Sequence, residues 1–137
     1  MVLLDAEELD FVLSGSDEID VDDWERNTKY TSDLLNHRVR RWFWEMVRSM
    51  SNEQRRRLLQ FATGSSRVPL AGFSALTSYD GKLCPFMLQG MHRGLDSYMR
   101  SHACFNRLDL PRYEKKAELE IMMASIVSGD GAGFTMQ

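Results

Sequence analysis

A short segment in the last third of the chain places a thiol among cationic side chains. Cys104 is preceded by Arg100 and His102 and followed by Arg107. The thiolate is the reactive form of cysteine, and nearby positive charge favours it. In an extended segment His102 and Cys104 would project to the same side. The spacing indicates a candidate nucleophile, although an isolated cysteine is more often a small core residue.

Other chemistries for the same residues are weaker. The three histidines and two cysteines do not form a metal-ligand spacing. A tyrosine-phosphatase loop needs His directly before Cys, whereas Ala103 intervenes here. A cysteine protease remains an alternative, because His37 or His92 could approach Cys104 in space. The basic residues are spread along the chain and are not interleaved with aromatic ones, so nucleic acid is not an expected partner.

The length and composition predict one folded domain, with or without a short appendage. The chain has 137 residues, 43% of them apolar, and a net charge of -3. That charge is uneven. Residues 1–27 hold ten acids and one base, whereas residues 28–137 hold ten acids and sixteen bases. Such asymmetry can indicate an acidic tail, a basic binding face or two pieces of different origin.

Cysteine usage and hydropathy bear on the compartment. Two cysteines, Cys84 and Cys104, are too few for a disulfide framework. No apolar run approaches the roughly 20 residues of a membrane helix, and the start of the chain lacks the basic residues of a secretory signal. We therefore expect a cytosolic or nuclear protein that does not bind membranes.

Helix signals mark five segments. Capping and periodicity predict short helices over residues 6–13 and 21–26, the second capped by Asp20. An apolar stripe predicts a helix over 38–50, with Trp44 falling outside the stripe. Ser51, with Gln54 three residues later, begins a further helix that stops at Gly64. The last predicted helix covers residues 114–127.

The remaining segments read as strands and connections. Residues 67–70, 85–88 and 104–108 are short apolar or alternating pieces between turn residues and are predicted strands. Residues 27–36 are polar without a clear period and read as a linker, and residues 90–100 read as a loop. Helices, short strands and a closing helix favour an α+β (mixed α/β) domain.

Beyond its chemistry, the segment around Cys104 is recognisable. The residues from His102 to Tyr113, His-Ala-Cys-Phe-Asn-Arg-Leu-Asp-Leu-Pro-Arg-Tyr, resemble the catalytic-cysteine segment of HECT-type ubiquitin-protein ligases. Arg41-Trp42-Phe43-Trp44-Glu45 resembles a helix of that family. The segments 51–61, 63–69 and 72–73 also resemble the family sequence. Ile19 to Trp24 resembles the end of the family's N-terminal lobe.

The resemblance implies a two-lobe arrangement. In this family a large N-terminal lobe docks the ubiquitin-conjugating enzyme, and a small C-terminal lobe, with helices packed around a short-stranded sheet, carries the cysteine. Residues 1–29 are thus expected to be the end of the N-terminal lobe, 30–36 an interlobe hinge, and 37–137 the C-terminal lobe. The rest of the N-terminal lobe would be missing from this chain.

The resemblance also implies a two-step transfer. The Cys104 thiolate would accept ubiquitin from the conjugating enzyme as a thioester, and a lysine of a protein substrate would then take it as an isopeptide. Neither step needs a metal or an organic cofactor. The alternative is a non-catalytic lobe that binds ubiquitin or regulates a partner.

Supporting roles follow from matched positions. His102 would polarise the thiol, orient the site or fix the loop. Asp109 would orient the incoming lysine or accept its proton, unless it is a solvated or turn-bonded residue. Phe134, fourth from the end, would dock near the cysteine and aid lysine transfer. A loop that would hold the ubiquitin tail comprises Ser65, Ser66 and Arg67.

The chain departs from the family pattern beside the thiol. Ala103 stands where the family usually has Thr, which removes one hydroxyl next to Cys104. Met99 and Arg112 stand where prolines are common, and Asp33-Leu34 replaces a Gly-aromatic pair in the expected hinge. None of these changes removes the nucleophile.

Overall fold

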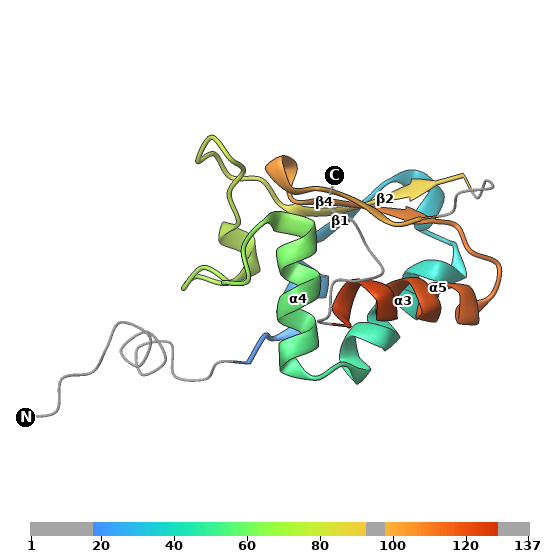
Figure 1. The fold of residues 1–137 in the computed structure, drawn as a ribbon. Helices are drawn as coiled ribbons and strands as arrows, with labels where there is room; N and C mark the ends of the chain where they lie inside the picture. Colours follow the sequence, from blue (N-terminus) through green and yellow to red (C-terminus); the bar gives the residue numbers. More distant parts are fainter. Residues whose placement is uncertain (1–17, 93–97, 129–137) are drawn as a thin grey trace, which may run out of the picture.

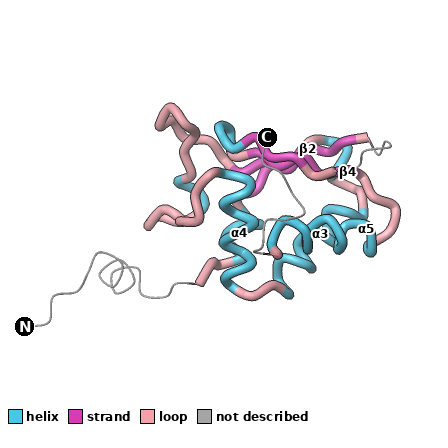
Figure 2. The backbone as a smooth tube through the Cα atoms, in the orientation of Figure 1, coloured by secondary structure: helices cyan, strands magenta, loops and turns pink. Residues whose placement is uncertain are grey.

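The fold has two layers, a sheet and a group of helices beneath it (Figure 1). The computed structural model describes residues 18–92 and 98–128. Helices α3 (Arg38–Ser49), α4 (Asn52–Thr63) and α5 (Lys116–Val127) lie on one face of the sheet, as the secondary-structure colouring shows (Figure 2). Helix α2 (Val21–Arg26) precedes them. This arrangement confirms the predicted α+β class.

The sheet is mixed and has the strand order β1-β2-β4-β3. Strand β2 is central and runs parallel to both β1 and β4, whereas β3 is antiparallel to β4. The bounds are β1 Thr28–Tyr30, β2 Phe86–Met91, β3 Arg100–His102 and β4 Arg107–Pro111. Helices α3 and α4 lie in the long connection between β1 and β2, which parallel pairing requires.

Three strand predictions need correction. Residues 67–70 form a loop and not a strand. The strand predicted at 85–88 exists but extends to Met91, so the predicted loop at 90–100 begins inside β2 and ends on β3. The strand predicted at 104–108 is interrupted, because residues 103–105 form a 3-10 turn, η3, and β4 begins only at Arg107.

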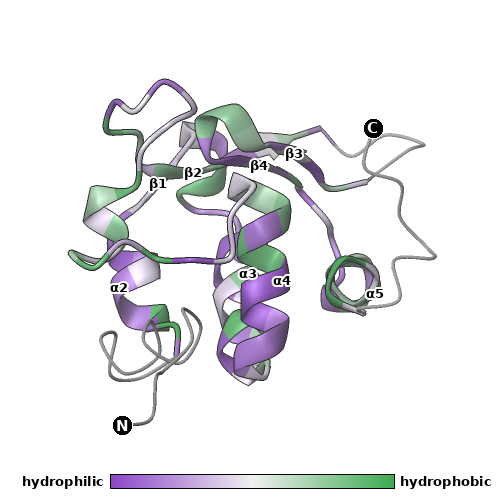
Figure 3. Ribbon diagram, turned by 60° about the vertical axis from the view of Figure 1, so that its left-hand side comes forward, coloured by the Kyte–Doolittle hydropathy of each residue, from purple (hydrophilic) through white to green (hydrophobic). Residues whose placement is uncertain are grey.

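Local capping signals set the helix ends as predicted. The Ser51 hydroxyl accepts the Gln54 N–H, and the Gln54 side chain accepts the Ser51 N–H, which completes a capping box at the start of α4. Gly64 ends α4 with φ 82°, a conformation that glycine adopts without steric cost. The Asp20 carboxylate accepts the Asp23 N–H and so caps the start of α2. Hydrophilic and hydrophobic residues alternate around α4, consistent with one buried face (Figure 3).

An aromatic cluster joins α2 to the rest of the core. Trp24 is fully buried, stacks on Phe73 at 5.0 Å and meets Phe86 edge-on at 5.4 Å. It also meets Trp44 edge-on, with ring centroids 5.7 Å apart. Burial of such large rings is the main source of stability in a core of this size. Residues 18–27 are therefore packed against the domain and are not a loose appendage of it.

Trp44 was predicted to lie outside the apolar stripe of its helix, and this is wrong. Its side chain is 2% exposed, and its indole N–H donates to the Tyr30 hydroxyl at 2.8 Å. The prediction assumed that α3 buries a single face. In the structure α3 packs against α5 and also against the aromatic cluster, so a second stripe is buried. Burial of the indole is favourable because its N–H group has a hydrogen-bond partner in the Tyr30 hydroxyl.

The segment predicted as a linker, residues 27–36, is structured. It contains β1 and a 3-10 turn, η1, at Ser32–Leu34. Leu34 is fully buried, and the Thr31 hydroxyl accepts the Gly90 N–H at 2.8 Å. Arg112 forms an ion pair with Asp33, which secures the turn from the other end of the chain. Whether this segment acts as a hinge between lobes stays a prediction.

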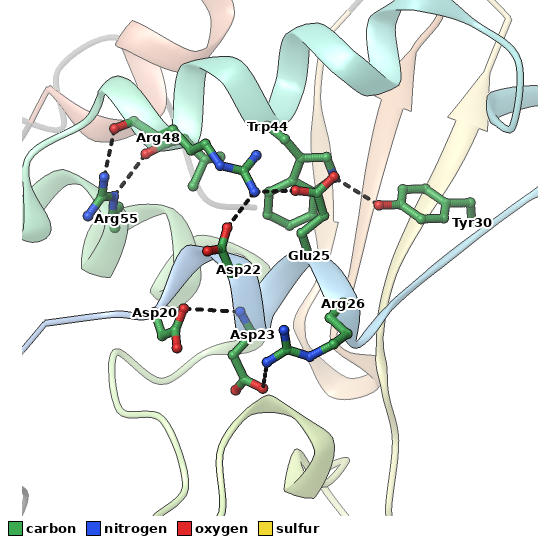
Figure 4. A network of polar contacts seen from close by, with 10 residues as sticks. Asp20, Asp22, Asp23, Glu25, Arg26, Tyr30, Trp44, Arg48 and Arg55 are labelled. Carbon is green, nitrogen blue, oxygen red and sulfur yellow. Dashed lines mark hydrogen bonds and ion pairs between the residues drawn. The ribbon is translucent and has the colours of Figure 1, made fainter.

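Exposed charges connect α2 with α3 and α4 (Figure 4). Arg48 of α3 donates to Asp22 at 2.8 Å and to Glu25, both on α2. The Arg48 guanidinium holds the pKa of the Asp22 carboxyl below its usual value. Arg55 of α4 donates to two main-chain carbonyls at the end of α3. These contacts fix the relative position of three helices at the surface.

Within residues 18–92 and 98–128, no helix has the length and apolar character to cross a bilayer. The predicted helix at 6–13 lies outside the described residues.

Candidate active site

Cys104 lies on the surface, in the middle of the single 3-10 turn η3 (Ala103–Phe105) between β3 and β4. Its side chain is exposed. The turn ends at Asn106, whose φ of 52° and ψ of 43° place it in the left-handed region. This reversal is the reason why the segment is not a continuous strand. The thiol and the His102 ring therefore do not share a strand face, contrary to the expectation from an extended segment.

Asn106 anchors the turn and was not singled out from the sequence. It is 2% exposed, and its amide N–H₂ donates to the carbonyls of Thr77 at 2.8 Å and Cys84 at 2.9 Å. Its own carbonyl accepts the Met87 N–H at 2.9 Å, which ties it to β2. Asparagine tolerates the left-handed conformation better than other residues with a Cβ. The sequence feature that could have pointed to Asn106 is its position two residues after Cys104, the candidate nucleophile.

His102 and Asp109, both predicted site residues, are in contact. His102 Nε2 lies 2.8 Å from Asp109 Oδ2. The Asp109 side chain is 7% exposed, whereas the His102 side chain is 38% exposed. The carboxylate is thus inside the domain, and the imidazole lies between it and the solvent. This arrangement allows the carboxylate to fix the tautomer and orientation of the ring.

The strand register explains the pair. His102 of β3 is directly opposite Arg107 of β4, and Asp109 is the next residue of β4 on the same face. Asp109 Oδ1 has no hydrogen-bond partner among the described residues, and neither has Arg107 Nε, which lies 3.8 Å away. The carboxylate is thus balanced by a nearby guanidinium and held by one strong contact, to His102.

The predicted ubiquitin-tail loop begins beside the cysteine turn. Ser65, Ser66 and Arg67 follow the end of α4, and a Cβ placed on Gly64 would lie 3.6 Å from the Ala103 side chain. The Ser65 hydroxyl accepts the Arg67 N–H at 3.2 Å, which shapes the loop. The structure therefore brings the start of this loop next to η3. Phe134 lies outside the described residues.

The loop before β2 covers the other side of the turn. The Tyr79 N–H donates to the Cys104 carbonyl at 3.2 Å, and the Tyr79 ring meets the Phe105 ring edge-on at 5.9 Å. Both rings are largely exposed, Tyr79 by 74% and Phe105 by 54%. Cys84 lies in the same loop and is half-buried. The thiol is therefore flanked by exposed aromatic surface.

The side chains at the turn suit thiol chemistry. Within the described residues, no three His, Cys, Asp or Glu side chains converge as metal ligands. What the turn offers is an exposed thiol, an imidazole backed by a carboxylate, and apolar surface on either side of it. Such a group of residues can carry an acyl group on sulfur and assist proton transfer near it.

Comparison with known proteins places this chain in a family. The model of the HECT domain, described as a ubiquitin-transferase domain, matches residues 1–137. The chain therefore belongs to the HECT-domain family.

Curated relatives agree. The chain is 39% identical over 132 residues to the E3 ubiquitin-protein ligase ptr1 of Schizosaccharomyces pombe, covering 96% of this chain and 4% of that protein. It is 42% identical over 137 residues to UPL2 of Arabidopsis thaliana, with the same coverage of each, and 43% identical over 129 residues to Nedd-4 of Drosophila melanogaster, covering 93% and 12%. Both are also named E3 ubiquitin-protein ligases. The chain spans a small part of these relatives.

Proposed function

We propose that this chain carries the catalytic cysteine of a ubiquitin-protein ligase. Cys104 accepts ubiquitin from a ubiquitin-conjugating enzyme as a thioester and passes it to a lysine of a protein substrate. The observation that carries the proposal is the exposure of Cys104 in the middle of the three-residue turn η3, in a chain that matches the family model along its length. A structural core cysteine would be buried.

The transfer balances as two acyl exchanges. The Cys104 thiolate attacks the thioester carbon on the conjugating enzyme, and the enzyme's sulfur leaves as a thiolate. The lysine amine then attacks the Cys104 thioester, loses a proton and releases the Cys104 thiolate. Sulfur is both a good nucleophile and a good leaving group, so one residue serves both steps.

We assign the proton transfers to His102, with Asp109 as a positioning residue. The attacking amine must lose a proton, and the imidazole is the more exposed member of the His102–Asp109 pair. Asp109 is too deeply buried for direct contact with a lysine, so it acts through the ring that it holds at 2.8 Å. This role replaces the direct orientation of lysine that its sequence position suggested.

The surroundings of the turn supply the binding surface. The extended C-terminal tail of ubiquitin would lie against the loop of Ser65, Ser66 and Arg67 and the exposed rings of Tyr79 and Phe105. In this proposal an N-terminal lobe docks the conjugating enzyme, and α2 and β1 belong with the cysteine-bearing lobe of residues 37–137, because they pack in its core and its sheet.

The direct test is adduct formation by the chain joined to the N-terminal lobe of a curated relative. Mixed with ubiquitin-charged conjugating enzyme, this protein should form a ubiquitin adduct that reductant removes. Cys104→Ser should form an adduct that resists reductant, since an oxygen ester replaces the thioester, and Cys104→Ala should form none. Cys84→Ser is the matched control and should retain the reducible adduct. A reducible adduct in Cys104→Ala would refute the assignment.

The role of Asp109 has a separate readout. Asp109→Asn keeps the size of the side chain but removes its charge, and we expect discharge of the Cys104 thioester to free amine to slow by on the order of 10²-fold. The pH profile of discharge should also change, because the ring loses its carboxylate. Asp22→Asn, on the exposed side of α2, is the control. An unchanged profile in Asp109→Asn would leave only a structural role for the residue.

The alternative is a lobe that binds ubiquitin without catalysing transfer. Ubiquitin binding that is unchanged in Cys104→Ala, without any thioester on the two-lobe protein, would favour it.

A further inference from the structure

The second cysteine of the chain, Cys84, contacts the turn of the candidate active site. Cys84 and Cys104 are twenty residues apart in sequence, yet Cys84 Sγ donates to the main-chain carbonyl of Phe105 across 3.2 Å. Phe105 directly follows Cys104, and neighbouring Cα atoms are about 3.8 Å apart. The second thiol therefore contacts the very turn that carries the first.

The contact is built into the fold. Asn106 binds the Cys84 carbonyl at 2.9 Å, and Tyr79 binds the Cys104 carbonyl at 3.2 Å. The loop that carries Cys84 is thus fastened to the turn that carries Cys104 at two main-chain positions. These bonds hold the backbone of the Cys84 loop against the turn without the participation of either cysteine side chain.

The turn itself has room to adjust. Its closing bond, from the Asn106 N–H to the Ala103 carbonyl, is long at 3.4 Å. A disulfide requires Cα atoms about 4.4–6.8 Å apart, so its formation calls for a rearrangement of this turn that carries Cys104 toward Cys84. The disulfide would replace the hydrogen bond from the Cys84 thiol to the Phe105 carbonyl.

The two thiols also differ in access. Cys104 is exposed, whereas Cys84 is half-buried. A peroxide in solution will therefore meet Cys104 first, and Cys84 is placed to react with the product. An exposed reactive thiol with a resolving thiol beside it is the arrangement of redox-sensing cysteines.

We propose that Cys84 is a resolving cysteine for Cys104. Peroxide then inactivates the Cys104 thiol reversibly by converting the two cysteines into a Cys84–Cys104 disulfide. The Cys104 thiolate attacks a hydroperoxide, which gives the sulfenic acid and releases hydroxide or alkoxide. The Cys84 sulfur then attacks the sulfenic sulfur, and water leaves with the Cys84 proton. Peroxide is the oxidant, and the two thiols are oxidised together by two electrons. A thiol reductant restores both.

The consequence is protection as well as inactivation. Without a partner thiol, a sulfenic acid is oxidised further to the sulfinic acid, which ordinary thiols do not reduce. When Cys84 is present, the oxidation of Cys104 stops at the disulfide, and a thiol reductant can restore the Cys104 thiol. The proposal concerns the thiol of the proposed function but needs only that Cys104 reacts with peroxide, not that it carries ubiquitin.

The experiment uses the whole chain and intact mass. Dilute chain treated with a small excess of hydrogen peroxide should lose two hydrogen atoms and fall from two alkylatable thiols to none. A non-reducing tryptic digest should contain peptide 83–93 joined to peptide 101–107. Reductant should restore both thiols. Cys84→Ser at the same dose should instead gain two oxygen atoms on Cys104, and reductant should not remove them.

Each result of the peroxide experiment either supports or overturns the resolving role of Cys84. Wild-type chain that gains oxygen on Cys104 without the joined peptides overturns the proposal, as does joining only between two copies of the chain. In Cys104→Ser the Cys84 thiol should stay alkylatable at the same dose, since it is the less accessible sulfur. Because no ubiquitin is present, failure here leaves the proposed ligase function standing, and failure of adduct formation would leave this result unaffected.

Discussion

The helical side of the molecule and the cysteine turn are held together by different kinds of interaction. On the helical side Trp24 and Trp44 are buried in an aromatic cluster, and the charges of Arg48 and its partners are exposed above it. At the turn Cys104 is exposed, and one buried amide, that of Asn106, supplies the directional contacts. Burial of aromatic side chains stabilises the helical side, whereas directional hydrogen bonds define the conformation of the cysteine turn. Mutations should therefore separate stability from reactivity.

The largest effect should come from Trp24→Ala. Removal of a fully buried indole leaves a cavity in contact with Phe73 and Phe86, and we expect a loss of about 3–5 kcal/mol in the free energy of unfolding. Urea unfolding followed by circular dichroism measures it. Trp24→Phe should lose less. Below the unfolding transition, the alkylation rate of Cys104 should stay within twofold, and a larger change would show that the two regions are not independent.

Asn106→Ala should affect both properties. Two main-chain carbonyls lose their donor, and alanine is strained at positive φ, so we expect a loss of roughly 2–3 kcal/mol. The alkylation rate of Cys104 should change severalfold, because the turn is no longer fixed. Asn106→Gly removes the amide without the strain. If glycine restores both stability and alkylation rate, the hydrogen bonds are not what positions the thiol.

His37 should make stability depend on pH. Its Nδ1 accepts the Val39 N–H at 3.0 Å, which caps α3 only when that nitrogen is unprotonated. Burial, with Arg112 and Arg38 nearby, holds the pKa of His37 below its usual value of 6.5. Since the unfolded chain then binds the proton more tightly, stability is complete above pH 6.5 and falls as the pH drops toward the folded value.

His37→Ala tests this dependence, with an expected loss of about 0.5–1 kcal/mol at pH 8 for removal of the cap. The slope of unfolding free energy against pH between 5 and 7 should become smaller in this variant. His92→Ala serves as the comparison. An unchanged slope in His37→Ala would assign the pH dependence to another group.

The smallest effect should be that of Arg48→Ala. Its side chain is 44% exposed, and the partners Asp22 and Glu25 are 76% and 34% exposed, so solvent screens both pairs. We expect a loss below about 1 kcal/mol that shrinks in high salt. Thermal unfolding at low and high salt measures it. A loss as large as that of Trp24→Ala would mean that the surface network, and not the aromatic cluster, holds α2 in place.

Elements with local signals were predictable from the sequence. The Ser51–Gln54 capping box and Gly64 defined α4 almost to the residue, because each signal lies within one turn of the helix end that it marks. Helix α3 was also predicted, but the burial of Trp44 was not. Burial on a second face depends on elements distant in sequence, and periodicity along one helix does not report them.

Strands and the site depend on distant partners. Residues 67–70 have a strand-like composition but pair with no strand in the described part of the chain, whereas the polar residues of β1 pair with β2. Cys104 was identified as a candidate nucleophile from residue types and family resemblance. Its turn was nevertheless predicted as a strand, because the pattern of apolar residues does not reveal the left-handed conformation of Asn106. The His102–Asp109 contact follows from the β3–β4 register, which no local pattern specifies.

The position of β2 between two parallel partners means that the sheet needs strands from distant parts of the sequence. Thr28 of β1 pairs with Phe86, and Met87 of β2 pairs with Arg107. During synthesis β1 emerges early and must wait for β2, and β2 in turn waits for β4. Asn106 and Asp109 come with that last strand. Helices α2, α3 and α4 are therefore synthesised before the strand that follows Cys104, and we expect Cys104 to be among the last residues of the domain to take a fixed place.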